Sequence, residues 1–318
     1  MANWTSYARI SSLLLLLLGV GGGRTDEFEY SNQASWYDKF EQCSLHHQSP
    51  IELNSKESDL RYDIPPISFG NYDSEQSSPA KIANNGHTVN IQLLRPTRLL
   101  ANLRQVDNEK MAPFITGGPL PHGRFVAESL HFHWGSKDAH GSEHVIDSER
   151  FSMEMHIVHR NSKYRTIDQA HSHADGLAVL ALIYTVKYED VATGFTGLES
   201  VLRALEDIKE FNATTEVSDF KPGILIAELD RSEFYTYAGS LTTPPCSEAV
   251  TWIVFSHVIP VSHQQMSRFH KLSDDHGARL ENNYRSLQAK GNRRVTLRKE
   301  RKVIDSIIEL PIFWKNLV

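Results

Sequence analysis

Several segments of the chain alternate apolar and polar residues, which is the period-2 pattern of strands. The clearest are HTVNIQL (87–93), SLHFHW (129–134), FSMEMHIVH (151–159) and VTWIVF (250–255). One segment, LESVLRALEDI (198–208), instead has apolar residues at helical spacing. The pattern therefore predicts a strand-rich protein with a few short helices outside the sheet.

The sequence between the two ends of the chain predicts a single domain. No internal repeat or low-complexity linker interrupts it between about Asp26 and Arg298, and glycine and proline are spread evenly. We expect a domain over residues 24–300 and a C-terminal extension over 301–318. The extension is too short and too charged to span a membrane, and a lipid-anchor signal requires a cleaner hydrophobic tail.

The first 23 residues, MANWTSYARISSLLLLLLGVGGG, combine one positive charge at Arg9 with an apolar run from Leu13 to Val20 and small residues after it. These features predict a secretory signal peptide that is cleaved near Gly23. An uncleaved membrane anchor is the alternative, but the apolar run is well short of the roughly 20 residues that span a bilayer. We therefore expect a secreted, extracellular protein whose mature chain has no membrane span.

Composition narrows the class of protein. The chain has 318 residues, of which 40% are hydrophobic and 23% charged, so it can bury a sizeable core. Its formal net charge is −6, and no basic run before the last thirty residues is long enough to follow a phosphate backbone. A nucleic-acid partner is therefore not expected.

The chain has only two cysteines, Cys43 and Cys246. In an oxidising compartment such a pair forms a structural disulfide, and two free buried thiols are the alternative. A bridge would close a loop of about 200 residues and stabilise the fold by on the order of 5 kcal/mol in the chain-entropy model. The sequon at Asn212 is a candidate glycosylation site.

The segment HFHWG places His131 and His133 two residues apart on a predicted strand, so their imidazoles share a face. Two ligands do not complete a catalytic zinc site, which usually takes three protein ligands and leaves the fourth position open. MEMHIVH supplies His156 on another predicted strand, with Glu154 beside it on the same face as a hydrogen-bond partner. If the two strands pair, three imidazoles converge; otherwise the first pair is a chance occurrence among 16 histidines.

These motifs resemble those of the alpha-class carbonic anhydrases, and in particular the secreted type with one disulfide. The resemblance covers roughly Phe28 to Arg298 in the family's order. It rests on SLHFHWGS and MEMHIVH together with QSPI (48–51), NNGH (84–87), GGPL (117–120), GSEH (141–144), DGLAVL (175–180) and GSLTTPPCSEAVTW (239–252). It implies a mainly β, single-domain fold with a central twisted, mostly antiparallel ten-stranded sheet and short peripheral helices.

The resemblance also implies roles for individual residues. His131, His133 and His156 match the three ligands of Zn²⁺, and Glu154 matches the carboxylate that orients the third of them. Thr242 matches the threonine that accepts a hydrogen bond from zinc-bound hydroxide, and Glu143 matches the carboxylate that takes the proton of this threonine. The remaining matches are the proton shuttle His87, the substrate-pocket residues Val158, Val179, Leu241, Val250, Trp252 and Thr243, and the disulfide pair Cys43 and Cys246.

Two positions depart from the family pattern or match it loosely. Ser129 stands where active members commonly have a glutamine that supports the first zinc ligand, so weaker retention of zinc is expected. Tyr30 corresponds to a tyrosine that borders the proton path.

The function that the resemblance implies is the reversible hydration of carbon dioxide to bicarbonate and a proton, with these small molecules as the partners. A catalytically silent extracellular binding module and a zinc hydrolase that acts mainly on esters are the alternatives.

Overall fold

The computed structural model describes residues 28–74, 79–93, 110–138, 140–187 and 195–301. The predicted signal peptide lies outside these residues, as does all but the first residue of the predicted C-terminal extension. Both segments therefore stay predictions, as do the domain boundaries.

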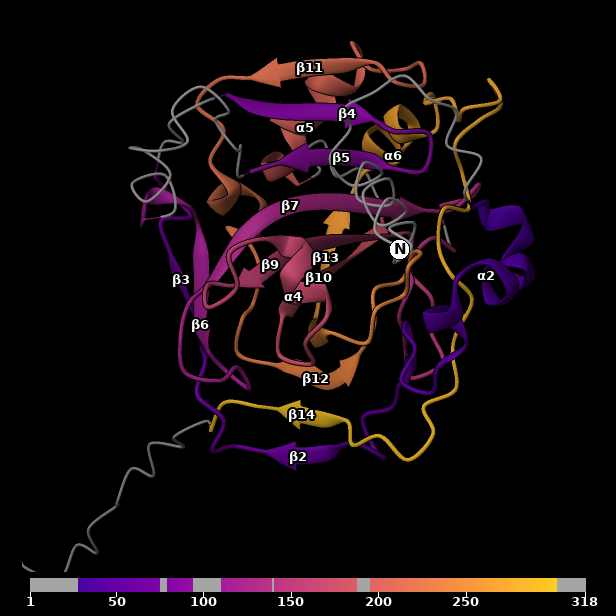
Figure 1. Cartoon of the computed structure of the whole chain (residues 1–318). Helices are drawn as coiled ribbons and strands as arrows, with labels where there is room; N and C mark the ends of the chain where they lie inside the picture. The colour runs from indigo at the N-terminus through magenta and orange to yellow at the C-terminus, as the bar shows by residue number, and fades with distance from the viewer. Residues whose placement is uncertain (1–27, 75–78, 94–109, 139, 188–194, 302–318) are drawn as a thin grey trace, which may run out of the picture.

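A large sheet forms the centre of the part of the chain that the structure describes. Ten strands follow one another across it in the order β11, β4, β5, β7, β9, β10, β13, β12, β14 and β2 (Figure 1). They are β11 (Thr214–Val217), β4 (Ala80–Asn84), β5 (Val89–Gln92), β7 (Phe125–Trp134), β9 (Met153–Asn161), β10 (Leu177–Val186), β13 (Val250–Val261), β12 (Phe234–Gly239), β14 (Thr296–Arg298) and β2 (Asp59–Arg61).

Two further strands bring this sheet to twelve where ten were expected. β3 (Ile67–Gly70) pairs with β6 (Phe114–Gly117), and β6 also pairs with the start of β7. Both strands have four residues, and in each only one side chain is buried, Ile67 in β3 and Ile115 in β6. A separate two-stranded sheet joins β1 (Glu52–Leu53) and β8 (Val145–Ile146).

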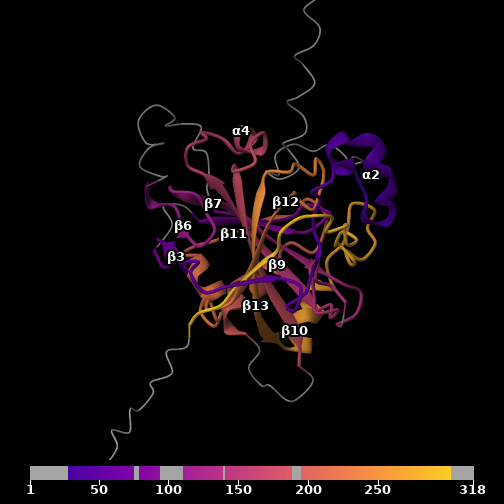
Figure 2. The same ribbon diagram turned by 90° about the horizontal axis from the view of Figure 1, so that it is seen from below.

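The expected mostly antiparallel arrangement is confirmed. In the large sheet the described pairs are antiparallel except β10 with β13 and β14 with β2. Short helices surround it, and Figure 2 shows α2 and α4 on the same side of the strands. They are η1 (Tyr30–Asn32), α2 (Ala34–Lys39), η2 (Glu41–Ser44), α4 (Ile167–His171), η3 (Thr196–Leu198), α5 (Glu199–Leu205), η4 (Pro222–Ile226) and α6 (His263–Phe269).

The central strands are buried on both faces, and alternation divides their side chains between two apolar clusters. On β9, Met155 and Ile157 belong to the larger cluster, whereas Val158 belongs to the smaller cluster on the opposite face. β10 repeats this pattern, with Leu180 in the larger cluster and Val179 in the smaller one. Because successive residues of a strand point to opposite faces, His131 and His133 share one face of β7, while Phe132 and its alternate neighbours belong to the larger cluster.

Cys43 of η2 and Cys246, in the loop between β12 and β13, form a disulfide across 203 residues of sequence. The predicted bridge is thus confirmed over the alternative of two free thiols. It connects the N-terminal helical segment to the loop that carries Thr242. No helix among the described residues is long and apolar enough to cross a membrane.

Candidate metal centre and active site

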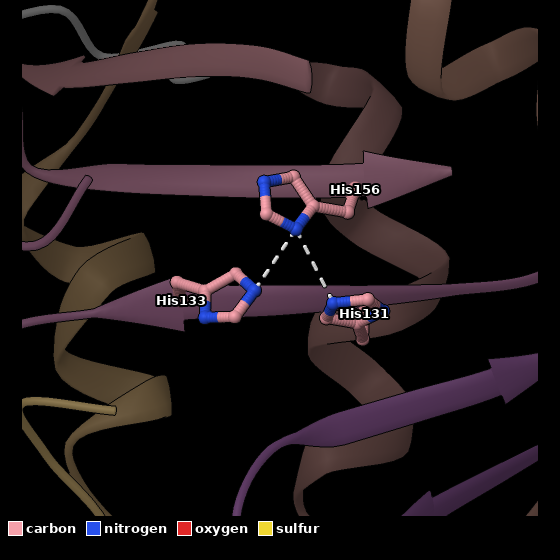
Figure 3. A group of neighbouring side chains, drawn as sticks. All are labelled: His131, His133 and His156. Atoms are coloured by element: carbon pink, nitrogen blue, oxygen red, sulfur yellow. Dashed lines mark hydrogen bonds between the residues drawn. The ribbon is translucent and has the colours of Figure 1, made fainter. Parts of the chain in front are cut away.

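Strand register brings the three candidate ligands together. β7 and β9 are antiparallel neighbours, and His131 lies directly opposite His156. His133 is two residues further along β7, on the same face as His131. Figure 3 shows the ring of His156 facing the rings of both β7 histidines.

The facing nitrogens have the spacing of a tetrahedral metal site. Nδ1 of His156 lies 3.0 Å from Nε2 of His133 and 3.3 Å from Nε2 of His131. Two nitrogens that are each about 2.05 Å from a tetrahedral zinc ion lie about 3.3 Å apart. Burial lowers the pKa of His131 and of His133. The other two histidines lower the pKa of His131 further, whereas for His133 the carboxylate of Glu143 acts in the opposite direction without outweighing burial. The neutral imidazole that a metal requires is therefore the favoured form, and the site fits zinc.

The outward-facing ring nitrogens differ among the three histidines. Nδ1 of His133 lies 2.7 Å from the main-chain oxygen of Asn283, and Nε2 of His156 lies 2.7 Å from Oε1 of Glu154. Nδ1 of His131 is buried and has no hydrogen-bond partner among the described residues. Ser129, predicted to be a weak support, is buried and makes no hydrogen bond to this nitrogen. Two of the three rings are thus held from behind and one is not.

Glu154 belongs to a buried polar network that extends away from the metal site. Its Oε1 lies 2.7 Å from Nδ1 of His144, and its Oε2 accepts a hydrogen bond from the main-chain nitrogen of His144. Nε2 of His144 lies 2.8 Å from the hydroxyl of Tyr237, which donates to Ser49. Burial alone would raise the pKa of Glu154, but His144 and His156 together hold it well below the usual value. Glu154 is therefore an anionic acceptor for the proton on His156.

Glu143 and Thr242 both lie beside the metal site, but no hydrogen bond joins them among the residues that the structure describes. Glu143 is fully buried, and its Oε1 accepts a hydrogen bond from the main-chain nitrogen of Arg285 at 2.7 Å. Its Oε2 is buried without a hydrogen-bond partner within the described part of the chain, and it lies 3.9 Å from Nδ1 of His156. Thr242 is 4% exposed and lies with His131 in the wall of a small cavity beside the histidines. The carboxylate therefore has one oxygen held by the main chain and one available.

A small cavity opens beside the histidines, with a volume of about 20 Å³. This is room for roughly one water-sized group. Its walls combine apolar and polar side chains: Val158, Ile167, Val179, Leu241 and Trp252, with Ser129, His131, His156, His171, Thr242 and Thr243. The sequence predicted most of these, but not Ile167 or His171. Val250 is buried in the adjoining apolar cluster and is not among the residues that line the cavity.

His87 lies in the turn between β4 and β5. Gly86 has a φ of 82°, a conformation that favours glycine, and the side chain of Asn85 accepts a hydrogen bond from the main-chain nitrogen of His87. The imidazole is 7% exposed and stacks on Phe28, with ring centroids 4.2 Å apart. Burial lowers its pKa, while Asp275, Asp274 and Glu29 act in the opposite direction.

Two other predicted positions lie nearer the surface. The ring of Tyr30 is 6.4 Å from that of His87, and the pKa of Tyr30 is raised well above its usual value, chiefly by burial and then by Glu143. Asn212 is exposed in the turn before β11, with a φ of 64°.

Comparison with known protein families identifies the family to which the chain belongs. A sequence model of eukaryotic-type carbonic anhydrases matches residues 31–299. The chain belongs to the carbonic anhydrase family. Mouse carbonic anhydrase 15 is 34% identical over 319 aligned positions, which cover 96% of this chain and 94% of the relative. Mouse carbonic anhydrase 6 is 31% identical, with 98% and 92% covered, and human carbonic anhydrase 3 is 32% identical, with 74% and 82% covered.

The sequence analysis also missed two residues that support the ligands of this carbonic anhydrase site, Asn283 and His144. Asn283 holds His133 through its main-chain oxygen, and its side chain accepts a hydrogen bond from the main chain of Trp134 and donates to the main-chain oxygen of His87. It lies 150 residues after His133 and in no segment that carries a metal-binding pattern. His144 could have been noticed in the sequence, because it directly follows Glu143 in GSEH.

Proposed function

We propose that the protein catalyses the reversible hydration of carbon dioxide to bicarbonate and a proton, with zinc held by His131, His133 and His156. The convergence of their three ring nitrogens is the observation that carries the proposal. Zinc held by these three residues would supply a nucleophile at neutral pH, since zinc lowers the pKa of water from 15.7 to about 7.

Thr242 and Glu143 would orient the reaction. Oε2 of Glu143, which makes no hydrogen bond within the described residues, would accept the hydroxyl proton of Thr242. A threonine that donates its only proton to a carboxylate can only accept from a group on its other side. With its own proton directed at Glu143, the hydroxyl oxygen of Thr242 would accept a hydrogen bond from the nucleophile and so orient the nucleophile's lone pairs towards the substrate, which is catalysis by orientation.

The apolar wall suits carbon dioxide, which has no charge and no strong hydrogen-bonding group. Val158, Val179, Leu241 and Trp252 line one cavity next to the histidines, and Thr243 adds a polar edge. Such a wall binds an apolar molecule and excludes water from it.

His87 would carry the released proton. Its ordinary pKa near 6.5 lies in the physiological range, and burial shifts it downwards. A lowered pKa favours the release of a proton over its retention, so His87 would return quickly to the neutral form.

An extracellular setting is part of the proposal. The disulfide between Cys43 and Cys246 is typical of an oxidising compartment. The N-terminal sequence has the features of a signal peptide. Asn212, in the sequon, is exposed as a glycan acceptor must be.

The role of Thr242 gives the sharpest test of the mechanism. The variant Thr242→Val keeps the side-chain shape and removes the hydroxyl, and we expect its zinc content to be unchanged. Carbon dioxide hydration should fall by roughly 10²-fold, the usual cost of a lost orienting or proton-transfer group. An unchanged hydration rate at equal zinc content would contradict the assigned role. Measuring ester hydrolysis in parallel separates a hydrolase from a hydratase.

A further inference from the structure

The ring of His87 has little contact with solvent, although the proposed reaction requires protons to leave it. Only 7% of the residue is exposed, and its Nε2 is buried without a hydrogen-bond partner among the described residues. Phe28 covers one face of the ring, with centroids 4.2 Å apart. A base takes a proton only from within hydrogen-bond reach or through one water. A buffer molecule in solution therefore has poor access to His87, and a further group on the protein would speed the release of its proton.

Residues 273–277 form a loop after α6 that lies against the turn carrying His87. The side chain of Asn84, at the end of β4, donates a hydrogen bond to the main chain of this loop at 2.9 Å. A Cβ atom placed on Gly86 would lie 3.3 Å from the main-chain nitrogen of Asp275. Asp275 is also the charged group that most strongly opposes the lowering of the pKa of His87 by burial. The loop thus brings a carboxylate close to the buried imidazole.

From this carboxylate, a series of side chains leads to the surface. Oδ1 of Asp275 lies 3.2 Å from Nδ1 of His276, and Nε2 of His276 lies 3.7 Å from Oε1 of Glu29. The side chain of Asp275 is 11% exposed, whereas those of His276 and Glu29 are 52% and 57% exposed. Glu29 directly follows Phe28, the residue that stacks on His87. Exposure to solvent therefore increases stepwise from His87 through Asp275 to His276.

Hydrogen bonds of the loop hold the main chain of His276 in place. Oδ1 of Asp274 accepts hydrogen bonds from the main-chain nitrogens of His276 and Ala278, at 2.9 and 2.8 Å. The main-chain nitrogen of Ser273 donates to the main-chain oxygen of Lys209 at 2.8 Å. The loop is therefore anchored at its start and closed by a side chain of its own.

We propose that His276 is the outer proton acceptor of this protein: it receives from His87 the proton that hydration releases and passes it to a base in solution. In this transfer an N–H bond of the protonated His87 breaks and an N–H bond forms on His276, with water as the carrier between the two rings. The base in solution then takes the same proton, so both imidazoles return to the neutral form. The inference rests on the proposed function, because it takes His87 as the inner proton carrier.

The surroundings of the two histidines favour this direction of transfer. Burial disfavours the charged form of His87. His276, in contrast, is half exposed and lies between the carboxylates of Asp275 and Glu29. Both carboxylates attract the positive charge that moves outward with the proton. An imidazole suits this role, because imidazoles take up and release protons near neutral pH.

Hydration of carbon dioxide by the zinc-loaded full chain, measured by stopped flow in weak and in strong imidazole buffer, tests the inference. In weak buffer we expect His276→Ala to lower kcat about threefold, less than the roughly 10²-fold effect of a group that acts at the reacting atoms. The value of kcat/KM should not change, because proton export follows the carbon dioxide step. In strong buffer kcat should match that of the wild type, since frequent encounters with imidazole offset the poor access to His87.

A second histidine and a second background provide the controls. His263, at the start of α6, is also exposed, and its Nδ1 pairs with a carboxylate oxygen of Asp138. His263→Ala should keep the wild-type kcat in weak buffer. In His87→Ala, adding His276→Ala should cause no further loss, because the outer acceptor acts only through the inner carrier.

An equal kcat for His276→Ala and the wild type in weak buffer would overturn the inference. A loss that persists in strong imidazole, that adds to the loss in His87→Ala, or that His263→Ala shares would overturn it as well. Each of these results leaves hydration by the wild type, and with it the proposed function, intact. Absence of hydration by the zinc-loaded wild type would overturn both.

Discussion

Replacing Ser129 with glutamine should tighten zinc binding, because the structure leaves one ligand unsupported. Nδ1 of His131 is buried without a partner among the described residues, while the outer nitrogens of His133 and His156 are each 2.7 Å from an oxygen. Ser129 lies two residues before His131 on the same strand face, where a longer amide side chain can reach that nitrogen. Ser129→Gln would give the third ring the support that the other two have.

The expected gain is about tenfold in zinc affinity. An outer hydrogen-bond partner of a metal ligand is typically worth 10- to 100-fold, and each factor of ten equals about 1.4 kcal/mol. The cost of a buried polar group without a partner, about 1–3 kcal/mol, covers the same range. Because the glutamine must also fit into a cavity of about 20 Å³, we expect the lower end of this 10- to 100-fold range of affinity.

The dissociation constant of zinc, measured by competition with a chelator of known affinity, checks this value. Ser129→Ala is the matched control, and its zinc affinity should stay within about twofold of the wild type, because Nδ1 of His131 receives no hydrogen bond from the serine. The reasoning is refuted if Ser129→Gln leaves zinc affinity unchanged. It is also refuted if Ser129→Ala weakens binding tenfold, since the serine would then already support the ring.

Three further outcomes follow from the structure. Replacing Cys43 and Cys246 with serine should lower the free energy of unfolding by on the order of 5 kcal/mol, measured by denaturant titration, because the bridge closes a loop of 203 residues. Burial lowers the pKa of His159 to about 3, so between pH 6.5 and 3 the unfolded chain binds one more proton than the folded chain. The free energy of unfolding should therefore fall as the pH drops through this window. The fall should be shallower in His159→Gln, as measured by denaturant unfolding at a series of pH values. His87→Ala should lower the maximal hydration rate at least about tenfold in weak buffer and recover it with added imidazole, with kcat/KM unchanged; a loss that imidazole does not rescue would argue against proton transfer.

The sequence predicted those parts of the site that depend on local pattern. Period-2 alternation assigned His131 and His133 to one face of a strand, and Glu154 and His156 to one face of another, and these assignments depend only on neighbouring residues. The pairing register that sets His131 opposite His156 was conditional on the two strands being neighbours. That arrangement depends on the whole sheet, and only the structure supplies it.

Other contacts come from segments that no local pattern connects. The loop after α6 brings Asn283 behind His133, although 150 residues separate them. α4 brings His171 into the cavity from a segment for which the sequence predicted neither a helix nor a site residue. In contrast, the sequence alone identified Ser129 as a departure from the family pattern. The structure adds the reason that this departure matters, because Nδ1 of His131 has no hydrogen-bond partner among the described residues.

The most direct test of the central claim is stopped-flow carbon dioxide hydration by the purified chain, with its zinc content measured on the same sample. The account predicts about one zinc per chain, a hydration rate well above the uncatalysed background, and loss of both in His131→Ala. Full zinc occupancy with no hydration above background would contradict the account and favour a silent binding module.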